Sequence, residues 1–123
     1  MSDPTTVVDA FMAAICDKDL ERAVTFCTDD VTYDNVPIGA VKGHDGIREV
    51  LGGFMAGSSQ VDWVVHHQVA AGDVVMNERL DRFEMAHGWV EIRVAGLFVL
   101  TDGKISVWRD YFDMAMLQSQ LGG

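Results

Sequence analysis

The sequence predicts an α+β fold: N-terminal helices packed on a strongly curved, mixed but mainly antiparallel sheet, forming a cone with an internal pocket. Two observations carry this prediction. Apolar residues recur at helical intervals up to about residue 55, and at intervals of two, as in strands, from about residue 60. Helices followed by an antiparallel meander are typical of the α+β class. The length of 123 residues, with no linker or repeat, predicts one domain over residues 1–123.

Three helices are expected in the first half of the chain. Asp3 and Pro4 supply an N-cap and a proline at the first helical position. The apolar face of this first helix contains Val7, Val8, Phe11, Met12 and Ile15. A second helix is expected over residues 20–27 and a third after Gly43. A final short helix is expected in "MAMLQSQL", near the end of the chain.

The strands are predicted from alternation and from the breaks between them. One strand is expected early in the chain, in "DVTYDNV", and four follow the helices. These four cover residues 61–70, 74–85, 89–100 and 105–112. Their breaks, "AGD", "AHG" and "TDGK", contain the glycine that short hairpins require.

The composition excludes several classes of partner. A formal net charge of −10 argues against nucleic acid and anionic membrane surfaces, which are bound through clustered basic residues. No apolar run reaches the roughly 20 residues that span a bilayer, and the first ten residues lack the basic and apolar regions of a signal peptide. We therefore expect a cytoplasmic protein. Cys16 and Cys27 lie in helical patterns as small apolar residues, and no metal or cofactor is expected.

Polar side chains interrupt three of the expected strands in pairs two residues apart. The pairs are Tyr33 with Asn35, Arg79 with Asp81, and Trp108 with Asp110. Residues two apart share one face of a strand. If these faces line the cone, its interior is an apolar wall with one polar cluster. The alternative is that the pairs lie at the surface or form structural ion pairs.

Two carboxylates separated by an arginine can act as an acid and a base. Different surroundings push their proton affinities apart, so that one stays ionised while the other holds a proton. The ionised group can take a proton from a water that a tyrosine and an asparagine hold in place. The protonated group can give a proton to a leaving oxygen. Such a set is suited to opening a strained cyclic ether with water.

Three segments also carry a resemblance to a known family. "YDNVP" (33–37), "NERLD" (77–81) and "WRDYFD" (108–113) resemble the signature segments of the limonene-1,2-epoxide hydrolase family. The order of helices and sheet resembles the larger cone-shaped superfamily that also contains ketosteroid isomerase and nuclear transport factor 2. The resemblance covers roughly residues 5–117.

The resemblance implies a role for each polar residue. Asp110 is expected to be the general base, with Tyr33 and Asn35 holding the attacking water. Asp81 is expected to protonate the epoxide oxygen, and Arg79 to lie between the two aspartates. The reaction would convert a small hydrophobic epoxide and water into a vicinal diol in one step, without a cofactor, in a homodimer. The expected pocket wall comprises Met12, Ile15, Phe54, Phe83, Ile92, Val94, Trp108, Phe112 and Leu117.

Two other functions stay open on the sequence. An isomerase or cyclase of the ketosteroid-isomerase type would use Asp110 as its base and Tyr33 as an oxyanion donor. A non-catalytic binding or dimerisation module would use the outer face of the 89–100 strand, with Trp89, Glu91 and Arg93, as its interface. The presence of Arg79 between two aspartates favours hydrolysis.

Overall fold

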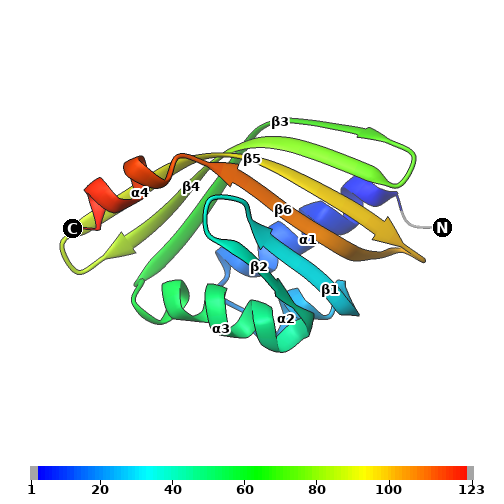
Figure 1. Cartoon of the computed structure of the whole chain (residues 1–123), viewed down its shortest axis with the longest axis horizontal. Helices are drawn as coiled ribbons and strands as arrows, with labels where there is room; N and C mark the ends of the chain where they lie inside the picture. Colours follow the sequence, from blue (N-terminus) through cyan, green and yellow to red (C-terminus); the bar gives the residue numbers. More distant parts are fainter. Residues whose placement is uncertain (1–2, 122–123) are drawn as a thin grey trace.

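The computed structural model describes residues 3–121, in which four helices accompany one six-stranded sheet (Figure 1). The helices are α1 (Pro4–Cys16), α2 (Leu20–Val24), α3 (Gly43–Ala56) and α4 (Met114–Gln120). The strands are β1 (Cys27–Asn35), β2 (Gly39–Lys42), β3 (Gln60–Ala71), β4 (Val74–Met85), β5 (Gly88–Thr101) and β6 (Lys104–Phe112). The predicted α+β class, with its N-terminal helices on a mixed and mainly antiparallel sheet, is confirmed.

The sheet order is β2-β1-β6-β5-β4-β3. Strands β3 to β6 form an antiparallel meander, and β1 joins its far edge by pairing with β6 in parallel. The parallel pairing places Asn35 opposite Asp110 and Tyr33 opposite Trp108. Two segments about 75 residues apart in the chain are therefore neighbours, and their polar residues lie on the same face.

Helices α1, α2 and α3 lie on one side of the sheet (Figure 1). Helix α1 begins as the sequence predicts: the Asp3 side chain accepts a hydrogen bond from the Thr5 N–H at 2.9 Å, and Pro4 takes the first position. Asp113 is the N-cap of helix α4, and its carboxylate accepts from the Ala115 N–H at 2.9 Å. None of the helices in residues 3–121 is long and apolar enough to cross a bilayer.

In the first third of the chain one expectation is wrong and one element was not predicted. The second helix ends at Val24 instead of residue 27, and Cys27 begins β1, where it pairs with Ile105 of β6. Backbone pairing with β6 thus outweighs the helical spacing of the apolar residues. The short strand β2 was not expected, because its four residues contain two small side chains and no alternation.

The alternation expected for the long strands is present. In β4 the buried side chains are Val75, Asn77, Arg79, Asp81 and Phe83, and in β5 they are Val90, Ile92, Val94, Phe98 and Leu100. Arg79 is 1 % exposed and Asp81 is 4 % exposed. The polar pairs therefore face the helices, and the alternative that they lie at the surface is excluded.

Candidate active site

The Arg79 guanidinium lies between the two aspartates. Its Nε and Nη2 donate to Asp81 Oδ1 and Oδ2, both at 3.0 Å, in the paired geometry that favours arginine with carboxylate. The same Nη2 donates to Asp110 Oδ2 at 2.9 Å. Arg79 and Asp81 come from β4 and Asp110 from β6, so the intervening strand β5 must leave space for the contact.

Gly96 of β5 provides this space. It pairs with Asn77 on one side and with Asp110 on the other. A Cβ at this position would overlap Arg79 Nη1 and lie 2.9 Å from Asn77 Oδ1 and 3.0 Å from Asp110 Oδ1. A buried arginine can therefore cross β5 only because residue 96 has no side chain.

Further hydrogen bonds hold the outer atoms of this cluster. Arg79 Nη1 donates to Asn77 Oδ1 at 2.9 Å, and Asn77 Nδ2 donates to Gln68 Oε1 at 3.1 Å. Gln68 Nε2 in turn donates to Asp9 Oδ1 of α1 at 2.9 Å. The guanidinium is thus oriented by a chain of amides that ends at an exposed carboxylate.

Asp110 accepts a side-chain hydrogen bond from a second residue besides Arg79. Trp108 Nε1 donates to Asp110 Oδ1 at 3.0 Å. The Trp108 ring in turn stacks on Tyr33, with ring centres 3.9 Å apart and planes within 8°. Trp108 therefore holds the carboxylate of Asp110 and the ring of Tyr33 in a fixed relation.

Burial sets the protonation of the cluster. Desolvation raises the pKa of Asp81 from 3.8 to about 6, against the charge and hydrogen bonds of Arg79, which lower it. Desolvation also raises the pKa of Asp110, while Arg79 and the Trp108 N–H oppose the rise. Burial by itself would lower the pKa of Arg79, but the charges of Asp110 and Asp81 outweigh it and keep the guanidinium ionised. Burial, followed by the charge of Asp110, raises the pKa of Tyr33, so its phenol stays protonated.

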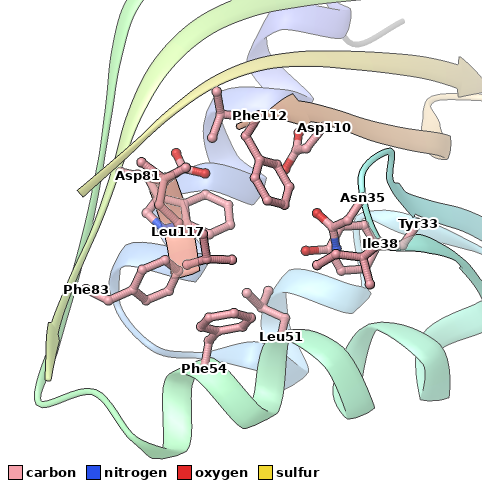
Figure 2. Close-up of a pocket in the computed structure, with 13 residues that line it drawn as sticks. Tyr33, Asn35, Ile38, Leu51, Phe54, Asp81, Phe83, Asp110, Phe112 and Leu117 are labelled. Carbon is pink, nitrogen blue, oxygen red and sulfur yellow. The ribbon is translucent and has the colours of Figure 1, made fainter. Parts of the chain in front are cut away.

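The polar cluster opens into a cavity of about 420 Å³, a volume that includes its mouth. Asp81 and Asp110 line it together with Tyr33 and Asn35, while Arg79 lies behind the two carboxylates. Figure 2 shows Leu51 and Phe54 of α3 projecting into the cavity from the helical side, and Asn35 and Tyr33 on the side opposite Asp81. The rest of the wall is apolar. The site can therefore hold a small apolar molecule against two buried carboxylates.

Comparison with known proteins decides the family. The family model described as "Limonene-1,2-epoxide hydrolase catalytic domain" matches residues 2–122. The curated "Epoxide hydrolase EphG" of Mycobacterium tuberculosis is 32 % identical over 107 residues, covering 87 % of this chain and 71 % of that protein. The chain belongs to the limonene-1,2-epoxide hydrolase family. It is an epoxide hydrolase of this type, which decides against the isomerase and the non-catalytic module.

Solved structures agree with this assignment. An LEH-like epoxide hydrolase of M. tuberculosis superposes with a TM-score of 0.83 at 30 % identity, covering 96 % of this chain and 88 % of that one. An NTF2-like protein of unknown function from Burkholderia pseudomallei superposes with a TM-score of 0.86 at 15 % identity, over the whole of both chains. The second likeness shows the fold alone. The fold is therefore of the NTF2-like type, as the order of helices and sheet predicts.

The cavity of this epoxide hydrolase contains part of the wall expected from the sequence. Six expected residues line it: Phe54, Phe83, Ile92, Val94, Phe112 and Leu117. The other three, Met12, Ile15 and Trp108, do not. Met12 and Ile15 are buried in the face of α1 that packs against the sheet, and Trp108 lies behind Tyr33 and Asp110.

Three residues that line the cavity were not expected there: Ile38, Leu51 and Trp63. Leu51 lies in the helix expected after Gly43 and Trp63 in the strand expected over residues 61–70, but neither was assigned to the pocket wall. Ile38 is 56 % exposed in the turn between β1 and β2, where neither periodicity applies. No cluster of three or more potential metal ligands occurs within the described range, residues 3–121.

The raised pKa of Asp81 makes the stability of this enzyme depend on pH. The folded pKa, about 6, exceeds the unfolded value of 3.8, so the folded protein binds a proton that the unfolded chain releases in this range. The stabilisation is complete below the unfolded pKa and is lost as the pH rises through the folded pKa. We expect the free energy of unfolding of the wild type, relative to Asp81→Asn, to fall between about pH 4 and about pH 7. Urea unfolding of both proteins measures it, and a pH-independent difference would contradict the assignment.

Proposed function

We propose that this protein adds water to a small hydrophobic epoxide in one step, with Asp110 as general base and Asp81 as general acid. The observation that supports this proposal is the buried Arg79 bridge between the two carboxylates at the wall of an apolar cavity. One guanidinium facing two carboxylates favours a state in which a single proton remains on the pair. The Trp108 N–H donates to Asp110, which supports ionised Asp110 as the base, and the resemblance to the family assigns the proton to Asp81.

The reaction balances within this set of residues. A water held by Tyr33 and Asn35 attacks an epoxide carbon and passes one proton to the Asp110 carboxylate. The bond between that carbon and the ring oxygen breaks, and its electron pair stays on the oxygen. The oxygen takes the proton of Asp81 and becomes the second hydroxyl of a vicinal diol. The proton on Asp110 is then lost and one is regained by Asp81, which restores the starting state.

The wall of the cavity supports a small, uncharged and largely apolar substrate. Aromatic and branched aliphatic side chains form most of this wall, around the two carboxylates. The strongly curved cone expected for this fold would enclose such a substrate between the sheet and α3. A closed, dry surrounding strengthens the hydrogen bonds and charges that act on the reacting oxygen.

A panel of epoxides in isotopically labelled water tests the proposal. It contains limonene-1,2-epoxide, cyclohexene oxide and a fatty-acid epoxide. We expect a vicinal diol from at least one of them, with one labelled oxygen per molecule, detected by mass spectrometry. A product isomeric with the substrate and free of label would contradict hydrolysis and indicate a double-bond or ring isomerisation.

We also propose that residues 1–123 act as one domain that pairs as a homodimer through the outer face of the sheet. Trp89 is 36 % exposed on this face, with Glu91 and Arg93 exposed on the same strand. Tyr111 of β6, 46 % exposed, lies on the same face. An apolar surface with charged groups of both signs is suited to contact with a second copy.

A further inference from the structure

Asn77 is a buried amide on the face of β4 that carries Arg79 and Asp81. It is 5 % exposed, and the proposed reaction assigns no role to it. A buried amide destabilises a fold unless its polar atoms have partners. Both ends of this amide have one: Arg79 Nη1 donates to Asn77 Oδ1 at 2.9 Å, and Asn77 Nδ2 donates to Gln68 Oε1 at 3.1 Å.

The direction of this chain of hydrogen bonds is fixed by its two ends. A guanidinium can only donate, and an ionised carboxylate can only accept. Arg79 stands at the buried end, and Asp9 of α1, at the exposed end, accepts from Gln68 Nε2 at 2.9 Å. Each amide between them therefore has one consistent orientation, with its oxygen towards Arg79. Asn77 consequently presents its oxygen, and not its NH2 group, to the guanidinium.

Asn77 and Asp81 hold the guanidinium from two sides along the strand. They lie two residues before and two residues after Arg79 on the same face of β4. Asn77 accepts from Nη1, and Asp81 accepts from Nε and Nη2. The remaining contact is that of Nη2 with Asp110 Oδ2 at 2.9 Å. Loss of the acceptor at Nη1 would let the guanidinium turn and weaken its contact with Asp110.

The acceptor that Asn77 supplies is also neutral. Arg79 carries one positive charge and contacts two carboxylates, Asp81 and Asp110. Desolvation raises the pKa of both carboxyl groups, and the charge of Arg79 opposes the rise. An acidic residue in place of the amide would be a third negative group on one cation, and the cluster would take up a further proton. An amide holds the guanidinium without competing for its charge.

We propose that Asn77 is a positioning residue for epoxide hydrolysis, which directs Arg79 towards both aspartates and leaves the charge of Arg79 to them. This inference rests on the proposed function. Asn77 does not line the cavity, so it acts on the reaction through Arg79. Gln68 and Asp9 contribute by fixing the direction of the Asn77 amide.

The isosteric change Asn77→Asp tests the role of the neutral amide. The new carboxylate competes with Asp110 for the charge of Arg79, so the pKa of Asp110 should rise. The acidic limb of the pH profile of kcat/KM reports the base of the free enzyme. We expect this limb to move up by about one pH unit or more. At the pH optimum of the wild type, kcat should fall by about 10- to 100-fold, while KM changes by less than about threefold.

Gln118→Glu is the matched control for the added charge. Gln118 is exposed on α4 and does not line the cavity. Its replacement adds the same single negative charge to the protein, and the pH profile and kcat should equal those of the wild type. Tyr33 of β1 and Cys16 of α1 also lie near the aspartates, and burial raises the pKa of both. These two groups stay neutral in all variants, so they do not cause a shift of the acidic limb.

Gln68→Leu tests the direction of the amide chain, and it can be measured even if Asn77→Asp does not fold. Leucine neither accepts from Asn77 Nδ2 nor donates to Asp9, so the Asn77 amide can turn its NH2 group towards Arg79. We expect kcat to fall by about 3- to 10-fold. Nuclear magnetic resonance of the nitrogen-labelled protein measures the guanidinium directly. The two hydrogens on Arg79 Nη1 should give separate signals in the wild type and one averaged signal in Gln68→Leu, because Nη1 loses its acceptor and rotates.

The outcomes separate this inference from the proposed function. If the wild type forms diol but the acidic limb of Asn77→Asp stays in place, the inference is wrong and the hydrolase proposal stands, even if kcat falls through altered packing. An equal shift in Gln118→Glu would show an effect of net charge and would also contradict the inference. If Asn77→Asp does not fold, wild-type kcat and separate Nη1 signals in Gln68→Leu overturn it. If the wild type forms no diol from any epoxide of the panel, the proposed function fails and the inference fails with it.

Discussion

Replacing Asp110 with asparagine is expected to lower kcat for epoxide hydrolysis by about 10²–10⁴-fold, the range that a positioned general base contributes. The amide cannot take a proton from water, whereas its oxygen can still accept from Trp108 Nε1. Arg79 also keeps its paired contact with Asp81, so the fold should persist. Steady-state diol formation with the epoxide panel measures the effect, and thermal unfolding confirms the fold.

Two further variants complete this test. Asp81→Asn should cause a loss of similar size, because the amide cannot supply a proton to the epoxide oxygen. Asp34→Asn is the matched control: Asp34 precedes Asn35 in β1, and its carboxylate accepts from Arg109 Nε at 3.2 Å. This variant removes one negative charge from β1 at a position that does not line the cavity. Its activity should be unchanged. Activity of Asp110→Asn within about tenfold of the wild type would contradict the assignment of the base.

Replacing Gly96 with alanine is expected to have the second large effect. The new methyl group would overlap Arg79 Nη1 and crowd Asn77 and Asp110, so the guanidinium must move away from at least one aspartate. A displacement of about 1 Å at such a site can lower the rate by about 10²-fold. Overpacking of a buried position also destabilises by about 1–3 kcal/mol. Diol formation and urea unfolding of the variant measure the two effects.

A double-mutant cycle shows whether Arg79 is the cause. In an Arg79→Ala background the methyl group no longer meets the guanidinium, so the destabilisation by Gly96→Ala should shrink by about 0.5–3 kcal/mol. Gly53→Ala is the control: no atom outside its own helix and chain neighbours in the described chain lies within 4 Å of the added methyl, and alanine favours helix α3 by about 1 kcal/mol. Equal destabilisation by Gly96→Ala in both backgrounds would show that the overlap with Arg79 is unimportant.

Local periodicity explains how much of this structure could be predicted. Strand β4 has the bounds expected from alternation, residues 74–85, and the same alternation places Arg79 and Asp81 on one face. The cap formed by Asp3 and Pro4 likewise predicts the start of α1. These features depend on residues within a few positions of one another, so they can be recognised in the chain itself.

The meeting of Arg79 with Asp110 depends on contacts that the chain does not display locally. It requires β5 to lie between β4 and β6, with Gly96 in register with both polar strands. The one sign in the sequence is Gly96 itself, a glycine within an alternating apolar face, which can indicate that another group approaches the backbone closely. Which groups approach it is decided by the register of β5 with β4 and β6. The parallel pairing of β1 with β6, which brings Asn35 to Asp110, is equally long-range.

In the wall of the cavity, too, local spacing predicts some features and long-range contacts decide the others. Spacing along α1 indicates correctly that Met12 and Ile15 are buried, but burial does not tell whether a side chain meets other side chains or open space. Trp63 could be recognised as buried, whereas its position beside Asp81 follows from pairing between β3 and β4. Alternation decides which way a side chain points, because it is a property of the backbone. What the side chain meets is decided by strand register and helix packing, which join residues far apart in the chain.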